Sequence, residues 1–94
     1  MFTTSDINLI NKSYFKTIKV NAYAVTLLSR NTKHYWHIIA QDYSTCSAYV
    51  IYHRTIDYGE YHYQCSRATF ATCLRYIKGH DRYIKNEKKK KNKR

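Results

Sequence analysis

Hydrophobic and polar residues alternate along the middle of the chain, between residues 15 and 65. Alternation with a period of two is typical of strands that bury one face. The alternating runs are rich in β-branched and aromatic residues, and polar residues bound each of them. The pattern predicts five strands, at residues 15–20, 23–30, 34–41, 48–54 and 61–65.

Short polar segments separate the later strands. Residues 30–33, 42–45 and 57–60 have the composition of turns, and Gly59 supplies a permissive backbone in the last of them. Turns this short join antiparallel neighbours, so we expect the strands to form a meander.

Helical spacing replaces alternation at both ends of the chain. Residues 4–6 are typical of a helix start and predict a short helix over 5–13, and Ser66 predicts the cap of a second helix over about 67–83. The apolar side chains of the second helix share an arc of about 100°, the width of a face that packs on a sheet. These side chains are Phe70, Cys73, Leu74, Ile77 and Ile84.

The predicted fold class is therefore α+β. An antiparallel five-stranded meander is flanked by a short N-terminal helix and by a C-terminal helix packed on one sheet face. The chain has 94 residues, which allows one domain, and we assign it to residues 1–84. Residues 85–94 hold six lysines and no apolar residue, so they are expected to form a disordered basic tail.

The chain carries a formal net charge of +11. The tail accounts for +6 of it, so the body is basic on its own. A basic surface attracts polyanions through long-range, salt-sensitive forces. This charge favours nucleic acid, or a complex of nucleic acid with protein, as the partner.

The second predicted helix also carries a cationic ridge within an arc of about 80°. The nearby carboxylate of Asp81 falls on the apolar side of the wheel, so salt bridges along the helix do not explain the ridge. Such a ridge suits phosphate contacts without sequence specificity, and the alternative is an ordinary solvated helix face. The ridge residues are Arg67, Arg75, Lys78, Arg82 and Lys85.

Tyrosine is over-represented, with 11 residues, and much of it falls in the predicted strands beside histidine. An exposed Tyr/His sheet face resembles the stacking platforms of single-strand binders. The alternative is that the tyrosines fill cross-strand pairs on a wet face. The candidate partner-binding residues of the sheet are Tyr35, His37, Tyr49, His53 and Arg54.

Histidines are candidates for acid–base or metal chemistry. His37, His53 and His62 lie on successive predicted strands and, with Arg54, could form a small ribonuclease site or a three-histidine metal site. No HxH or HExxH spacing supports either, and carboxylates are few and scattered. We therefore expect no enzyme, no catalytic residues, no metal and no cofactor.

Cysteine usage indicates a reducing compartment. Cys46, Cys65 and Cys73 form no CxxC pair, and the N-terminal residues lack the pattern of a secretory signal. No apolar run approaches the ~20 residues of a membrane span. The expectation is a cytoplasmic protein, monomer or homodimer, without a membrane partner.

Three segments carry a family resemblance: KHYWHI at 33–38, AYVIYHR at 48–54 and CLRYIKGHD at 73–81. They resemble short uncharacterised proteins of phages and mobile elements of AT-rich Gram-positive bacteria. The resemblance implies a setting in which small proteins often inhibit host defence, anti-CRISPR proteins among them.

The leading hypothesis is a basic, non-enzymatic protein of a phage or mobile element that binds nucleic acid or a ribonucleoprotein, such as a CRISPR effector complex. One alternative is an anti-CRISPR-like inhibitor that binds the effector nuclease directly. A further alternative is a small ribonuclease toxin.

Overall fold

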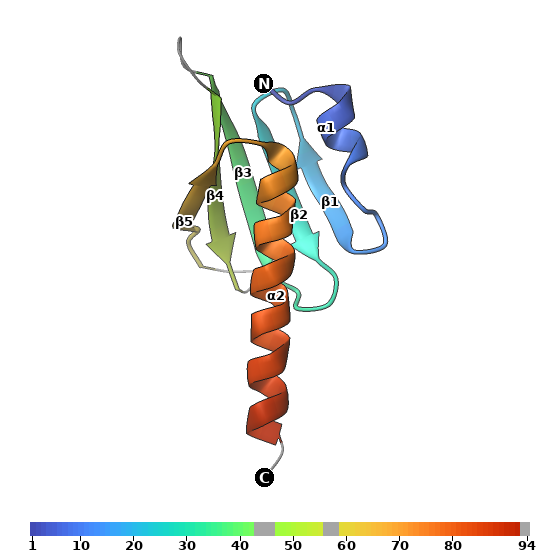
Figure 1. Ribbon diagram of the computed structural model, residues 1–94, viewed down its shortest axis with the longest axis vertical. Coiled ribbons are helices and arrows are strands. Elements are labelled where there is room, and N and C mark those ends of the chain that lie inside the picture. Colours follow the sequence, from blue (N-terminus) through green and yellow to red (C-terminus); the bar gives the residue numbers. More distant parts are fainter. Residues whose placement is uncertain (43–46, 56–58, 93–94) are drawn as a thin grey trace.

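Five antiparallel strands form one sheet in the order β1-β2-β3-β4-β5, and two helices flank it (Figure 1). The computed structural model describes residues 1–42, 47–55 and 59–92. The α+β fold and the meander are as the sequence predicts, and each strand begins and ends within two residues of its expected bounds. The elements are α1 (Thr4–Asn8), β1 (Phe15–Val20), β2 (Ala24–Ser29), β3 (Tyr35–Asp42), β4 (Ser47–Arg54), β5 (His62–Arg67) and α2 (Phe70–Asn92).

The strand register gathers the apolar residues on one face of the sheet. Trp36 pairs with His53 and Ile38 with Ile51, so these four side chains lie on the same face. Burial alternates along β3 accordingly, and Trp36 and Ile38 are fully buried. Helix α2 crosses this face and closes the core (Figure 1). The apolar residues that α2 buries there are Phe70, Cys73, Leu74 and Ile77.

Helix α1 is shorter than the sequence suggests and ends at Asn8 rather than near residue 13. Thr3 and Asp6 form a capping box, in which each side chain accepts a hydrogen bond from the other's backbone N–H. Beyond the helix, the Asn11 carboxamide oxygen accepts hydrogen bonds from the backbone N–H groups of Ser13 and Tyr14. Side-chain hydrogen bonds of this kind compete with helix and form a turn instead.

Helix α2 differs from the prediction at both ends. It begins at Phe70, where the Thr69 hydroxyl accepts a 3.2 Å hydrogen bond from the Thr72 N–H, whereas Ser66 belongs to the sheet and pairs with Val50.

The helix continues to Asn92, so residues 85–92, expected to be a disordered tail, are helical. Lysine and glutamate propagate an existing helix well, and cations are favourable near a helix C-terminus. The last turns of α2 extend beyond the ends of the strands and give the molecule extents of 53 × 24 × 24 Å (Figure 1).

Cys73 is buried in the core, as its place on the apolar face of the second helix predicts, and Cys65 is half-buried on β5. Cys46 lies outside the described residues, as do most of the predicted turns at 42–45 and 57–60. Within the described part of the chain, neither helix has the length and hydrophobicity to cross a membrane.

Candidate functional site

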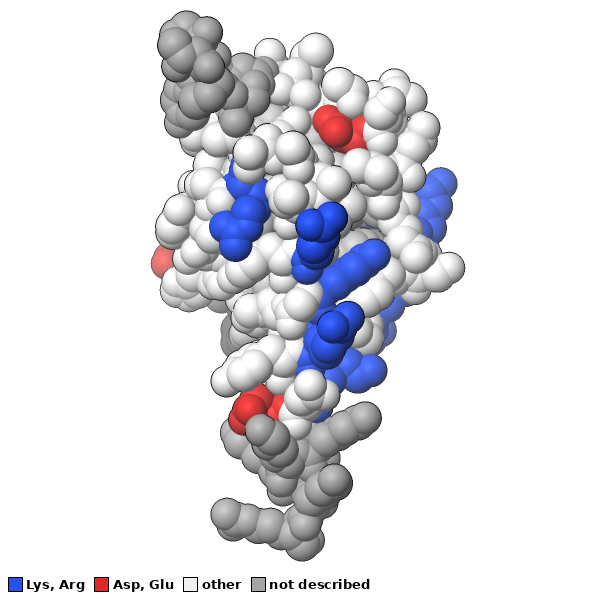
Figure 2. All heavy atoms as spheres, viewed as in Figure 1, with Lys and Arg blue, Asp and Glu red and all other residues white. Residues whose placement is uncertain are grey.

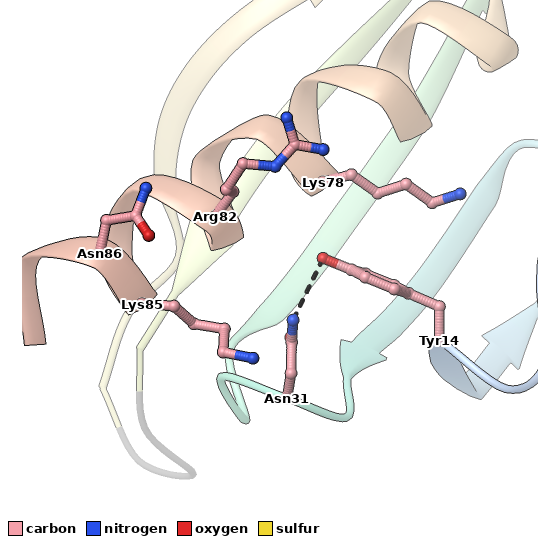
Figure 3. Close-up of a pocket in the computed structure, with 6 residues that line it drawn as sticks. All are labelled: Tyr14, Asn31, Lys78, Arg82, Lys85 and Asn86. Atoms are coloured by element: carbon pink, nitrogen blue, oxygen red, sulfur yellow. Dashed lines mark hydrogen bonds between the residues drawn. The ribbon is translucent and has the colours of Figure 1, made fainter. Parts of the chain in front are cut away.

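Three residues of the predicted ridge line one pocket. Lys78, Arg82 and Lys85 follow one another at intervals of three or four residues, which places them on one face of α2. The pocket has a volume of about 270 Å³ and lies between α2, the segment before β1 and the β2–β3 turn (Figure 3). Its lining residues are Tyr14, Asn31, Lys78, Arg82, Lys85 and Asn86.

The far wall of this cationic pocket is neutral. The Tyr14 hydroxyl donates a 2.7 Å hydrogen bond to the Asp81 carboxylate, and burial together with that bond raises the pKa of Tyr14 to about 12. The Lys78 ammonium lies 5.4 Å from the centre of the Tyr14 ring. None of the described lining residues is acidic, because Asp81 is fully buried and points its oxygens at hydroxyl groups. The pocket therefore has the charge of an anion site.

The other two ridge residues lie apart from this pocket. Arg75 is exposed and lines a neighbouring hollow of about 240 Å³ that also includes Leu9 and Lys78. Arg67 is the last residue of β5, not a residue of α2, and its guanidinium donates to the Ser66 carbonyl and lies 5.1 Å from the Tyr76 ring centre. Figure 2 shows Lys and Arg side chains gathered over α2 on this side of the molecule.

The candidate residues of the sheet do not share one face. Tyr35, His37 and Arg54 lie on the face opposite α2, whereas Tyr49 and His53 lie on the covered face with the core. The expectation that Tyr49 and His53 belong to an exposed binding face is thus incorrect. The reason is the β3–β4 register, which pairs Trp36 with His53 and so places both rings under α2.

The rings of the open face contact one another. The Arg54 guanidinium lies over both Tyr35 and Tyr61, at 4.5 and 4.7 Å from the ring centres. His37 Nδ1 is hydrogen-bonded to the Thr26 hydroxyl at 2.8 Å, and burial together with the charge of Lys19 lowers its pKa. These are the cross-strand contacts of the alternative interpretation. Tyr63, 60% exposed, offers a ring to solvent on this face.

The histidines that converge are not the three that the sequence indicated. His37 lies on the open face. His62 is the cross-strand partner of His53 on β5, but its side chain is exposed and it is not one of the histidines whose nitrogens converge. Instead His34, His53 and His80 meet, with one nitrogen of each within 4.8 Å of the others. They come from the β2–β3 turn, from β4 and from α2.

The three-histidine cluster is packed against Trp36. The His53 ring stacks on the indole with centroids 4.2 Å apart, and the His80 ring meets it edge-on at 5.2 Å. His53 Nε2 lies 2.9 Å from His34 Nδ1. Burial, with the charges of His34 and His80, lowers the pKa of His53 to about 4. His53 is therefore neutral at physiological pH.

Asp81 fixes the position of the cluster. Its carboxylate accepts hydrogen bonds from Ser29, the last residue of β2, at 2.6 Å and from Thr32, in the turn that leads to His34, at 2.9 Å. The His34 N–H donates to the Thr32 hydroxyl, and the His34 carbonyl accepts from the Ser29 N–H. Asp81 thus holds the turn with His34 against the helix that carries His80.

Sequence reasoning missed His34 and His80, although one signal pointed to them. Asp81 falls within the apolar arc of α2, and a carboxylate there must be buried with partners. Its neighbour His80 is then at the edge of the same interface. The sequence gives no comparable signal for the β3–β4 register, which brings His53 of β4 to the cluster.

No protein-family model matches the chain, and neither a curated protein nor a solved structure matches it.

Proposed function

We propose that this protein is a non-enzymatic binding protein for nucleic acid, free or within a ribonucleoprotein. The observation that supports this proposal is the pocket in which Lys78, Arg82 and Lys85 of α2 converge without an acidic lining residue. A phosphate group is the anion that three such cations suit best, because the guanidinium can bind two of its oxygens and the ammonium groups add charge.

The surroundings of the pocket favour a long polyanion over a small anion. The net charge of +11 extends well beyond the pocket, and Arg75 adds a cation one helical turn before Lys78. After Lys85 the sequence continues with Lys88, Lys89, Lys90 and Lys91. A chain of phosphates can contact several of these cations at once, and each contact releases counterions.

The test is binding of a labelled generic single strand and duplex, measured by fluorescence anisotropy from low to moderate salt. Neutralising three phosphates contributes about −2 (single strand) to −2.7 (duplex) to the slope of log affinity against log salt. The double variant Lys78→Glu with Arg82→Glu should bind more weakly at every salt and have a slope flatter by about 2.

The matched control is Lys16→Glu with Lys19→Glu, which makes the same change in net charge on the exposed strand β1. It should weaken binding only slightly. An equal loss in both variants would show that net charge, not the pocket, governs affinity. No binding at low salt overturns the nucleic-acid proposal. A bacterial pull-down that survives nuclease treatment would replace it with a protein partner.

A further inference from the structure

We infer that His34, His53 and His80 form a binding site for one divalent transition-metal ion, most suitably Zn²⁺. The inference is independent of the proposed nucleic-acid function, because it rests on other side chains. It starts from the meeting of three imidazoles from three separate elements, with one nitrogen of each within 4.8 Å of the others.

The distances are close to those that a metal requires. Tetrahedral zinc with Zn–N bonds of about 2.0–2.1 Å holds its nitrogen ligands about 3.3 Å apart. His34 Nδ1 and His53 Nε2, at 2.9 Å, need to separate by a few tenths of an ångström, and the third ring needs to approach. No pair of these nitrogens therefore has to approach by more than about 1.5 Å.

His80 provides a second, independent observation. Its Nδ1 atom is buried and has no hydrogen-bond partner among the described residues. A buried polar nitrogen normally has a partner, and an absent one often marks the place of an ion or a water molecule. Coordination of the ion through Nδ1 would give this atom a polar partner.

The cluster is also held in place before any ion binds. Asp81 fixes the turn that carries His34 to the helix that carries His80, and Trp36 supports the His53 ring by stacking at 4.2 Å. Such supporting contacts orient ligands and are typical of metal sites.

The donor set selects the class of ion. Three imidazole nitrogens suit zinc, copper, nickel and cobalt, whereas magnesium and calcium require oxygen ligands. His34 and His53 are each 8% exposed and His80 is half-buried. We assign the fourth position to a water molecule that enters beside His80. The bound ion would join β4 and the β2–β3 turn to α2.

The experiment uses untagged full-length protein, stripped with a chelator and titrated with Zn²⁺ by calorimetry. Trp36 is the single tryptophan and touches two of the ligands, so its fluorescence should change in parallel. We expect one equivalent of Zn²⁺ per chain, a higher thermal midpoint, and visible bands of four-coordinate Co²⁺. Mg²⁺ and Ca²⁺ should have no effect.

His37, on the opposite face of the sheet, provides the matched control. His80→Ala should lower Zn²⁺ affinity by at least about 100-fold, more than loss of an outer-shell partner costs. His37→Ala should leave affinity and stoichiometry unchanged. The inference is overturned if His80→Ala binds Zn²⁺ as the parent does, if His37→Ala loses binding equally, or if the parent shows no saturable Zn²⁺ site. Because His80 is half-buried, its variant should fold, which circular dichroism checks; if it does not, His34→Gln takes its place.

Discussion

The Ser29 hydroxyl donates a 2.6 Å hydrogen bond to the Asp81 carboxylate, and both residues are fully buried. The contact joins the end of β2 to the middle of α2. Ser29 also accepts a 3.1 Å hydrogen bond from the indole N–H of Trp36. A chain of polar contacts therefore runs from the core tryptophan to the helix, and its last member is a carboxylate with three hydroxyl donors.

Replacement of Asp81 by asparagine should lower the free energy of unfolding by about 1.5–3 kcal/mol, because hydrogen bonds to a charged acceptor are lost in a buried place. Urea unfolding followed by Trp36 fluorescence measures the loss. Glu60→Gln, an exposed carboxylate outside the network, is the control and should change nothing measurable. Equal stabilities for the two variants would mean that the network contributes little.

Removal of residues 88–94 should leave thermal stability nearly unchanged while weakening polyanion binding. The segment carries six of the eleven net charges but contains no apolar residue to bury. Lys85 and Asn86 must be retained, since they line the pocket. Calorimetric melting and the salt dependence of binding measure the two effects. A large drop in the melting temperature would instead show that the end of α2 stabilises the domain.

The stability of the protein should fall as the pH rises above 9, and Cys73 should contribute to the fall. Burial raises the pKa of its thiol from 9.0 to about 12, so between these values the unfolded thiol is ionised while the folded one keeps its proton. The slope is at most about 1.4 kcal/mol per pH unit for one proton. Unfolding by urea at several alkaline pH values should give a flatter slope for Cys73→Ala than for the parent. Equal slopes for Cys73→Ala and the parent would show that the thiol does not contribute to the loss of stability at alkaline pH.

Arg54 should stabilise the open face of the sheet through the two tyrosine rings it contacts. Arg54→Ala should cost about 1–2 kcal/mol, since each cation–π contact contributes about 0.5–1 kcal/mol. A double-mutant cycle with Tyr61→Leu isolates the contact. A coupling energy near zero between Arg54 and Tyr61 would contradict the prediction. It would favour instead the interpretation in which the side chains of this face stack on a partner.

The sequence was sufficient to predict the sheet, because alternation with a period of two is a local signal and short turns force neighbouring strands to be antiparallel. It was also sufficient for most of the apolar face of α2, where the buried residues recur at helical spacing. Ile84, predicted on the same face, is only half-buried and lies outside the core. The ends of α2 were predicted less well. Ser66 has the chemistry of a cap but pairs in the sheet, and a lysine run without apolar residues says little about whether an existing helix continues.

The histidine cluster depends on information that no local pattern carries. Which face of β4 meets α2 is decided by the β3–β4 register, and His53 follows Trp36 onto the covered face for that reason. His34 precedes its strand and reaches the cluster because Asp81 holds its turn, a contact across 49 residues between Thr32 and Asp81. Contacts of this range follow from the packed fold rather than from spacing.

The position of α2 in the chain has a consequence for how the molecule is made. The five strands pair with their nearest neighbours in sequence, so each hairpin can form as soon as its second strand has been synthesised. The covered face of the sheet, which includes Trp36 and Ile38, can pack against α2 only after residues 70–81 have been synthesised. Until that moment a nascent chain exposes an apolar sheet surface, and we expect chaperones to recognise that surface at this stage of synthesis.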